Sequence, residues 1–380
     1  MQELSIYIHI PFCKQKCLYC DFLSAPATGA VREEYVQALC EEICAESEHY
    51  TEHRVTTVFL GGGTPSLLSG EQVGRIFSCL RECYEFSDDA EITMEMNPGT
   101  VKEDKLREYK AAGINRISLG LQSADDEELR RLGRIHTWED FQATYELCRR
   151  YGFDNINVDL MSALPGQTLE SYKRTLEKVA ELAPEHISAY SLIIEEGTPF
   201  FEMYGEEAEG SHVIPLPDEE TEREMYTYTK EFLEKQGYYR YEISNYAKPG
   251  KECRHNCVYW QRGDYVGFGT GAASMVGNIR WSNVSDIRAY LSFRAEEKKV
   301  EQQRLTRSEQ MEETMFLGLR MTEGVSKQAF EERFGRSIDE IYEKVIEKHC
   351  RQGLLENDKC LHLTDKGVDV SNYVLADFLL

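Results

Sequence analysis

Short apolar, β-rich runs alternate with longer polar segments over about the first 240 residues of the chain. Runs of this length and composition are typical of strands, and polar segments with apolar residues every three or four positions are typical of helices. The pattern predicts strands at 4–10, 56–60, 91–96, 116–120, 155–160 and 186–193. It predicts helices between them at 31–49, 70–83, 102–112, 137–151 and 168–182. This alternation indicates a parallel sheet covered by helices.

Six strand–helix units are too few to close an eight-stranded barrel, so the sequence predicts an open, partial parallel β/α barrel over residues 1–240. Glycine- and aromatic-rich segments follow, and we expect loops that extend the barrel over 241–304. Residues 305–380 predict three helices, a short hairpin at 354–363 and a final helix, an order similar to a winged-helix module. The predicted fold class is therefore α/β with a small C-terminal module.

The chemically unusual residues come directly after the predicted strands. Functional loops of parallel barrels lie at the carboxyl ends of their strands, so we expect these residues on one rim. In the order of the strands that they follow, they are Cys13, Cys17 and Cys20; Gly61, Gly62, Gly63 and Thr64; Glu95; Gln122; and Asp159.

Composition and charge narrow the class of protein. The chain has 43 Lys and Arg against 67 Asp and Glu, a formal charge of −24, which argues against broad binding of nucleic acid or anionic lipid. No run approaches the roughly 18 apolar residues of a membrane span. The amino end alternates like a strand and lacks the basic segment and cleavage site of a signal peptide. Twelve cysteines without an export signal favour a reducing cytoplasm and a metal or catalytic role over a disulfide framework.

The spacing Cys13-x3-Cys17-x2-Cys20 is the most specific signal in the chain. Structural zinc usually takes four protein ligands, and no fourth stands close by, because the position two residues past the last cysteine is Phe22. A [4Fe–4S] cluster held by three cysteines leaves one iron open to another ligand. Three buried cysteines without a special role, or a zinc site completed from elsewhere, are the alternatives.

Together with Tyr19 before its last cysteine, this triplet resembles the signature of the radical S-adenosylmethionine (SAM) superfamily. Further segments resemble, in order, the oxygen-independent coproporphyrinogen III oxidase family; they are 7–13, 20–22, 61–66, 95–98, 120–123, 132–134 and 159–167. The resemblance covers essentially the whole chain. It implies a [4Fe–4S] cluster on the three cysteines, with the amino and carboxylate groups of SAM on the open iron. Reduction of the cluster would then cleave the sulfonium to a deoxyadenosyl radical.

The resemblance also implies which residues contact SAM. They are Tyr7, Tyr19, Gly61, Gly62, Gly63, Thr64, Glu95, Gln122, Arg134 and Asp159. From the residues alone, the glycines are equally a plain turn, Glu95 a helix cap and Tyr7 a core residue. Gly267–Gly271 superficially resembles a dinucleotide-binding loop, but no strand is predicted before it and the usual acidic residue is missing.

Two features separate members of this family. The oxidases carry a fourth cysteine where this chain has Phe22, which argues against a decarboxylating oxidase. The segment 254–260 resembles the His-Asn-x-x-Tyr-Trp motif of the HemW heme chaperones, which bind heme and hand it to acceptor proteins. That resemblance implies heme contacts from His255, Asn256, Tyr259 and Trp260.

Porphyrin chemistry offers a reason for such a segment. Tyr259 and Trp260 would cover an apolar porphyrin face, and His255 would ligate the iron. Cys253 and Cys257 bracket the motif and are further candidate ligands, and a purely structural loop is the alternative.

Three hypotheses of different classes therefore remain. The first is a heme chaperone with [4Fe–4S], SAM and heme as cofactors and heme-accepting proteins as partners. The second is a radical SAM enzyme that decarboxylates or methylates a tetrapyrrole or another acceptor. The third, a winged-helix DNA regulator, is disfavoured because the chain lacks a basic recognition helix, and we expect no nucleic-acid partner. A homodimer and docking to a membrane stay open.

Overall fold

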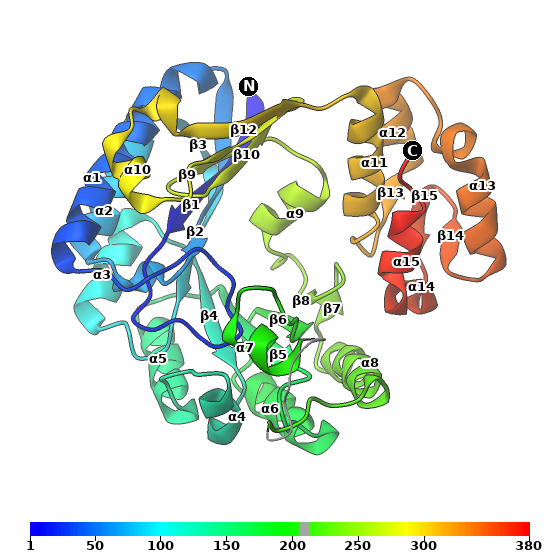
Figure 1. Cartoon of the computed structure of the whole chain (residues 1–380), viewed down its shortest axis with the longest axis horizontal. Helices are drawn as coiled ribbons and strands as arrows, with labels where there is room; N and C mark the ends of the chain where they lie inside the picture. Colours follow the sequence, from blue (N-terminus) through cyan, green and yellow to red (C-terminus); the bar gives the residue numbers. More distant parts are fainter. Residues whose placement is uncertain (206–212) are drawn as a thin grey trace.

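The computed structural model describes residues 1–205 and 213–380, and its centre is a curved sheet with helices along its outer side (Figure 1). Six strands run parallel in the order β1-β2-β3-β4-β5-β6. They are β1 (Gln2–Ile10), β2 (His53–Gly62), β3 (Glu85–Met96), β4 (Arg116–Gln122), β5 (Ile156–Ser162) and β6 (His186–Ser191). The prediction of an open parallel β/α barrel is confirmed.

Helices connect these strands and cover the outer face of the sheet. The predicted ones are α1 (Gly29–Glu46), α2 (Gly70–Cys83), α3 (Glu103–Ala112), α5 (Trp138–Arg150) and α6 (Leu169–Glu181). Their starts follow from local chemistry: the Ser69 and Thr168 side chains each accept a hydrogen bond from the backbone N–H three residues on, closing capping boxes. The sequence patterns did not indicate three others, α4 (Asp126–Arg131), α7 (Pro199–Tyr204) and α8 (Glu219–Lys235).

Both edges of the sheet carry strands that the sequence did not predict. On one side β8 (Asn245–Ala247) and β7 (Tyr239–Arg240) continue from β6. On the other side β9 (Tyr265–Phe268) pairs parallel with β1, and antiparallel strands continue the sheet. These are β10 (Ala273–Val276), β11 (Ile279–Asn283) and β12 (Lys299–Arg304), with α10 (Ile287–Ser292) between the last two. Single turns of 3₁₀-helix lie at Ser47–Tyr50, Pro65–Leu67 and Ala295–Lys298.

These edge strands correct two expectations. The region after residue 240 is not mainly loop, and a strand does lead into Gly267–Gly271, because β9 ends inside that segment. A Cβ atom at Gly267 would collide with the Ala273 carbonyl oxygen, so glycine is needed where β9 and β10 approach closely. The segment is a tight strand connection within the sheet.

The C-terminal module lies beside the open edge of the sheet and has its own core (Figure 1). Its helices are α11 (Arg307–Gly318), α12 (Lys327–Phe334), α13 (Ile338–Arg351), α14 (Asp365–Asp369) and α15 (Ser371–Ala376). A small antiparallel sheet joins β13 (Val325–Ser326), β15 (Cys360–Leu363) and β14 (Leu355–Asn357). This agrees with the expected helices and hairpin, although the predicted final helix is two short ones. No helix among the described residues is long and apolar enough to cross a membrane.

The main hydrophobic core lies between the sheet and its outer helices. On β1, Leu4, Ile6 and Ile8 belong to that core. Side chains alternate across a strand, so Ser5 and Tyr7 point to the opposite, inner side. Helix α9 (Arg254–Trp260) lies on that inner side, between the sheet and the C-terminal module (Figure 1). The inner side of the curved sheet is where the candidate site lies.

Candidate functional site

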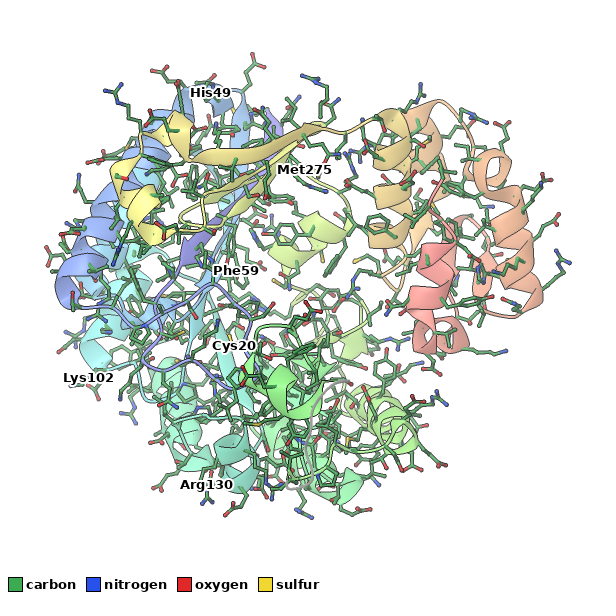
Figure 2. All side chains as sticks on the ribbon, viewed as in Figure 1. Cys20, His49, Phe59, Lys102, Arg130 and Met275 are labelled. Carbon is green, nitrogen blue, oxygen red and sulfur yellow. The ribbon has the colours of Figure 1, made fainter. Side chains whose placement is uncertain are left out.

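The inner side of the barrel is polar and encloses a cavity of about 420 Å³. Cys20 and Phe59, both labelled in Figure 2, line it from the centre of the molecule. Polar residues at every second position of β4, β5 and β6 form its wall; they are Arg116, Ser118 and Gln122, then Asn157 and Asp159, then His186, Ser188 and Tyr190. Strand register places them in rows across the sheet, since Ser118 pairs with Asn157 and Asn157 with His186.

Six of these wall residues were missed from the sequence: Arg116, Ser118, Asn157, His186, Ser188 and Tyr190. A detectable signal was present. Strands buried between two apolar layers are nearly continuous apolar runs, whereas β4 and β5 alternate polar and apolar residues. That alternation predicts a polar inner face.

The three cysteines stand on the loop between β1 and α1 and all line the cavity. Backbone hydrogen bonds fix the loop: Cys13 N–H donates to the Ala25 carbonyl at 3.1 Å, and Leu18 N–H donates to the Leu132 carbonyl at 3.0 Å. All three cysteines are partly exposed. Burial raises the pKa of the Cys20 thiol to about 11, so a metal that bound there would have to displace its proton.

A polar cluster surrounds these thiols. The Cys13 sulfur lies 3.4 Å from the Thr64 hydroxyl, and the Arg134 guanidinium donates to the Cys17 sulfur at 3.7 Å. Asn97 connects the two, because its amide donates to Thr64 at 2.8 Å and its carbonyl accepts from Arg134 at 2.9 Å. Tyr19 lines the same part of the cavity. The structure thus brings Tyr19, Thr64 and Arg134 to the cysteines, and adds Asn97.

The glycines at the end of β2 serve close packing within the protein. Gly62 has φ +105°, and its N–H donates to the Glu95 carboxylate at 3.1 Å. A Cβ atom at Gly63 would lie 2.7 Å from the Phe12 carbonyl oxygen, so a side chain there would push the cysteine loop away. Gly62 and Gly63 line the cavity, whereas Gly61 faces Phe59 and Glu95.

Two half-buried carboxyl groups, Glu95 and Asp159, stand on the cavity wall. Burial, reinforced by the charge of Asp159, raises the pKa of Glu95 to about 8. Burial also raises the pKa of Asp159, while donors from Asn157 at 2.8 Å and Ser118 at 3.2 Å partly oppose that shift. Glu95 is not a helix cap. It is a carboxyl group held largely protonated at neutral pH, ready to ionise when a cation arrives.

The remaining predicted SAM residues also line this cavity. The Tyr7 hydroxyl donates to His9 Nδ1 at 3.1 Å, and His9 Nε2 donates to the Leu23 carbonyl at 2.8 Å, which links β1 to the cysteine loop. Gln122 has φ +74° at a break in the β4–β5 register and accepts from the Tyr190 hydroxyl at 3.2 Å. A non-glycine residue in the left-handed region at the end of a strand turns its side chain towards the cavity.

His255 lies at the far end of the cavity and is only 1% exposed. Its Nδ1 is 2.7 Å from the Thr57 hydroxyl, and its Nε2 is 2.8 Å from the Tyr259 hydroxyl. Its ring stacks on Phe59 with centroids 5.2 Å apart. Burial, with the nearby charge of Arg116, lowers the pKa of His255 to about 3, so the imidazole is neutral. Both ring nitrogens are therefore engaged within the protein.

A carboxylate on β3 holds the helix that carries His255. Glu91 accepts hydrogen bonds from the Arg254 and His255 backbone N–H groups, each at 3.1 Å, and so caps the N-terminus of α9. The Cys253 thiol also points to Glu91, at 3.7 Å. Among the described residues that line the cavity, neither Cys253 nor Cys257 is found.

The structure separates the four residues predicted to contact heme. His255, Asn256 and Tyr259 line the barrel cavity, whereas Trp260 lines a second cavity of about 360 Å³ between α9 and the C-terminal module. There the Arg320 guanidinium lies over the Trp260 ring, 4.5 Å from its centroid. Tyr259 and Trp260 do not face one common cavity, so they do not cover one porphyrin face in this arrangement.

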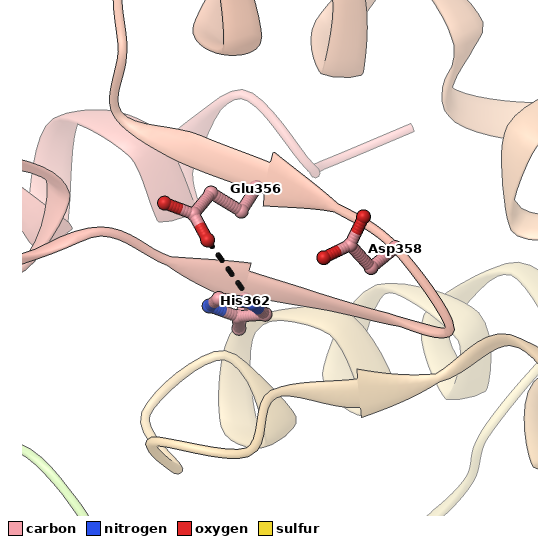
Figure 3. Close-up of side chains that lie close together, drawn as sticks. All are labelled: Glu356, Asp358 and His362. Atoms are coloured by element: carbon pink, nitrogen blue, oxygen red, sulfur yellow. Dashed lines mark ion pairs between the residues drawn. The ribbon is translucent and has the colours of Figure 1, made fainter.

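A different group of possible metal ligands stands on the hairpin of the C-terminal module. Glu356, Asp358 and His362 have ligand atoms within 4.8 Å of one another (Figure 3). The two carboxylates are exposed, and an ion pair between His362 and Glu356 at 3.7 Å accounts for their approach. Nothing else in the surroundings points to a ligand there.

The cysteine side of the barrel cavity has the donors that a three-cysteine [4Fe–4S] cluster needs. Three thiols line one cavity, an arginine donates to a sulfur, and Glu95 and Asp159 line the same cavity. Hydrogen bonds to ligand sulfurs and partial exclusion of water are the protein features that tune such clusters. The residues present therefore fit both the cluster and a polar organic ligand beside it.

Comparison with known proteins agrees with this geometry. The family model "Radical SAM superfamily" matches residues 7–179, and "HemN C-terminal domain" matches residues 305–370. The chain is 38% identical to heme chaperone HemW of Lactococcus lactis over 377 residues, covering 99% of this chain and 97% of that protein. It is 38% identical over 379 residues to heme chaperone HemW of Bacillus subtilis, covering 99% of each.

A solved structure extends the comparison to the fold. Coproporphyrinogen III oxidase (HemN) of Escherichia coli, described as a radical SAM enzyme, superposes with a TM-score of 0.84 at 25% identity. The match covers 100% of this chain and 90% of the oxidase, so it includes the barrel and the C-terminal module. Sequence identity above 30% along the full length, together with this shared architecture, shows that the chain belongs to the HemW family of radical SAM proteins.

Proposed function

We propose that the chain is a heme chaperone that binds heme and transfers it to acceptor proteins in the reducing cytoplasm. The observation that carries this proposal is the full-length similarity to proteins named heme chaperones, C-terminal module included. The position of Phe22 supports it against the oxidase, because no thiol stands where the oxidases have a fourth cysteine.

A [4Fe–4S] cluster on Cys13, Cys17 and Cys20, with SAM in the barrel cavity, is part of the proposal. Together they would supply one-electron reduction and radical chemistry at the sulfonium. The chain's own residues would position the cluster and SAM and shield them from water. Tyr19 and Arg134 lie on the cysteine side of the cavity, and Gln122 and Asp159 line the wall beside it. Glu95 would accept hydrogen bonds from ammonium or ribose groups once it has lost its proton.

We assign the heme contacts to α9 and its two neighbouring cavities, through His255, Asn256, Tyr259 and Trp260. Ligation of iron by His255 Nε2 requires the Tyr259 hydroxyl to release that nitrogen, because the two atoms are 2.8 Å apart. The order of events is therefore that α9 loosens before His255 can bind iron, while Trp260 already borders the cavity next to the C-terminal module.

Heme titrations of two variants test this assignment. His255→Ala should weaken heme binding and leave the iron and sulfide content of the cluster unchanged. Tyr259→Phe should tighten heme binding, because it frees Nε2 while keeping the ring. Tyr265→Phe is a matched control and should leave heme binding unchanged. The Tyr265 ring packs on Tyr259 with centroids 4.7 Å apart, but among the described residues its hydroxyl does not bond to His255. Unchanged affinity in both His255→Ala and Tyr259→Phe would move the heme site elsewhere.

The function itself is tested by an anaerobic assay. Reconstituted protein is mixed with heme, SAM, a strong reductant and an apo-hemoprotein, and the porphyrin is analysed by mass spectrometry. A chaperone delivers unaltered heme in proportion to the protein added. Formation of modified tetrapyrrole over many turnovers would contradict the proposal.

One observation favours a second candidate, a radical SAM enzyme acting on a tetrapyrrole. The Arg116 side chain is fully buried at the cavity wall, and its Nε has no hydrogen-bond partner among the described residues. An unpartnered buried N–H is costly, and a carboxylate of a bound substrate would satisfy it. The same assay separates the candidates, because only the enzyme consumes tetrapyrrole catalytically.

A further inference from the structure

Four cysteines outside the barrel cavity form a second thiol cluster, on the outer helices α1 and α2. Each helix carries a Cys-x3-Cys pair in its last two turns: Cys40 and Cys44 on α1, and Cys79 and Cys83 on α2. Residues four apart lie on the same face of a helix with Cβ atoms about 5–6 Å apart. The two helices pack side by side (Figure 1).

The sulfurs are in contact across this helix pair. The Cys83 thiol donates to the Cys44 sulfur at 3.3 Å. Cys40 and Cys79 stand one turn earlier on the same faces of their helices. Two Cys-x3-Cys pairs therefore meet where α1 packs on α2, joined by the Cys44–Cys83 contact.

This cluster is remote from the proposed iron–sulfur site. Cys13, Cys17 and Cys20 follow the carboxyl end of β1, on the cavity side. In a parallel β/α sheet the helices return in the opposite direction, so the last turns of α1 and α2 lie near the amino ends of the strands. The four thiols are therefore at the opposite rim and on the outer face of the sheet.

The surroundings suit a cation bound by thiolates. Helix C-termini carry partial negative charge, so four uncompensated thiolates would be unfavourable there, and Zn²⁺ offsets two of their four negative charges. Arg75 stands one turn before Cys79 on α2 and pairs with Glu33 through Nη1 at 2.6 Å, while its Nε and Nη2 are buried without a hydrogen-bond partner among the described residues. A metal-bound thiolate at Cys40 would accept from these N–H groups, as partners outside the ligand set often do. Cys44 is exposed and the other three are partly buried, so an ion can enter from solvent.

We propose that Cys40, Cys44, Cys79 and Cys83 form a zinc site that bridges α1 and α2. Four thiolates complete the tetrahedral shell of a structural Zn²⁺ ion, and helix pairs spaced i, i+4 supply two ligands each, as other zinc sites do. Among the described residues, these sulfurs do not form a group of three within 4.8 Å of one another, so the ion would draw them together through rotation of the side chains about χ1. The step balances as Zn²⁺ plus four thiols giving the tetrathiolate complex and four protons.

The proton balance makes the site pH-dependent. Binding of Zn²⁺ releases the thiol protons and therefore tightens as the pH rises.

Metal analysis of the full chain under anaerobic, reducing conditions tests the proposal. The starting protein is the Cys13→Ala/Cys17→Ala/Cys20→Ala variant, which removes the other thiol cluster and makes the result independent of the proposed heme function. It should bind one Zn²⁺ per chain, and Co²⁺ in its place should give the thiolate-to-metal charge-transfer and tetrahedral d–d bands of a four-sulfur site. Zn²⁺ should also raise its melting temperature.

Two further changes on that protein decide where the ion binds. Cys44→Ser/Cys83→Ser should abolish zinc binding and the cobalt bands. Cys350→Ser/Cys360→Ser, two partly buried thiols of the C-terminal module, should leave both intact. Failure of the folded starting protein to bind zinc, or zinc binding that survives Cys44→Ser/Cys83→Ser, would overturn the proposal. So would metal-free protein two hydrogens lighter per thiol pair, because that mass indicates disulfides.

Discussion

At the scale of single residues, the chemistry of the barrel cavity depends on groups that burial has moved away from their ordinary states. The Cys20 thiol and the Glu95 carboxyl both hold their protons more tightly than in water, and His255 is kept neutral. Each group is therefore prepared for a partner that would reverse its state: a metal for the thiol, and a cation for the carboxyl.

The first prediction concerns the cluster ligands. Cys17→Ala should abolish assembly of the cluster, because one iron loses its protein ligand and the Arg134 hydrogen bond loses its acceptor. Iron and acid-labile sulfide, measured after anaerobic reconstitution, provide the readout. Cys350→Ala, a partly buried thiol of α13, is the control and should keep the iron content of the unchanged chain. Full iron and sulfide content in Cys17→Ala would refute the assignment.

A second prediction follows from the raised pKa of Glu95. The folded chain keeps this proton up to about pH 8, whereas the unfolded chain releases it near the ordinary value of 4.5. The folded state binds more protons throughout that window, so Glu95 makes the free energy of unfolding fall as pH rises from about 5 to 8.

Glu95→Gln should remove this slope. Urea unfolding at several pH values gives the free energy of unfolding of both proteins. Between pH 5 and pH 8, that of the variant should rise relative to that of the unchanged chain by about a few kcal/mol. Glu71→Gln, an exposed residue of the first turn of α2, should run parallel to the unchanged chain. Parallel curves for Glu95→Gln as well would mean that Glu95 is ionised in the folded protein.

At the scale of elements, α9 is too short to be stable alone and depends on its contacts. It has seven residues, and its N-terminus is capped by Glu91 from a strand more than 160 residues earlier in the chain. Thr57 on β2 fixes its histidine. The element that carries the predicted heme residues is thus fastened to the sheet by polar contacts, a kind of attachment that can open locally.

Removing the cap tests that description. Glu91→Gln replaces charged hydrogen bonds at the helix N-terminus with neutral ones and should cost about 1–3 kcal/mol of stability. Hydrogen exchange of the α9 amides should accelerate more than exchange in α2. Asp88→Asn changes an exposed carboxylate on the same strand and should alter neither quantity. Equal exchange rates in α9 for Glu91→Gln and the unchanged chain would show that packing alone holds the helix.

At the scale of the whole molecule, polar contacts join the C-terminal module to the barrel. Arg262 and Arg280 both reach Glu313 of α11, at 3.0 and 2.9 Å, and the Arg262 side chain is 0% exposed. Asp365 of α14 meets Lys230 and Arg240 at 2.6 and 2.9 Å but is 70% exposed. The second cavity, beside Trp260, lies between these two parts.

These two junctions should differ strongly in strength. Glu313→Gln leaves the buried Arg262 charge uncompensated and should cost about 3 kcal/mol or more. Asp365→Asn breaks an exposed pair and should cost at most about 1 kcal/mol. Urea unfolding gives both values, and limited proteolysis between residues 298 and 310 should accelerate only in Glu313→Gln. Similar costs for the two variants would mean that the buried pair does not hold the module.

Sequence periodicity predicted the six parallel strands and the main outer helices, because side-chain alternation and helix caps are local properties. Ser69 and Thr168 begin helices with their own hydroxyl groups, and no distant contact is needed. The edge strands β9 to β12 were not predicted, since short strands with glycine and aromatic residues gain their stability from pairing with strands far away in the chain.

For the site, the sequence by itself determined that three thiols stand together, because they lie within eight residues on one loop. Only the tertiary structure decided what surrounds them. Thr57 and His255 are 198 residues apart in sequence but are in contact in the barrel. Cys44 and Cys83 are 39 residues apart in sequence and are in contact where α1 packs on α2. It also separated Trp260 from Tyr259, since neighbouring helix residues point about 100° apart and so face different cavities. The sequence sets which reactive side chains are neighbours along the chain, whereas tertiary packing sets which distant residues contact them.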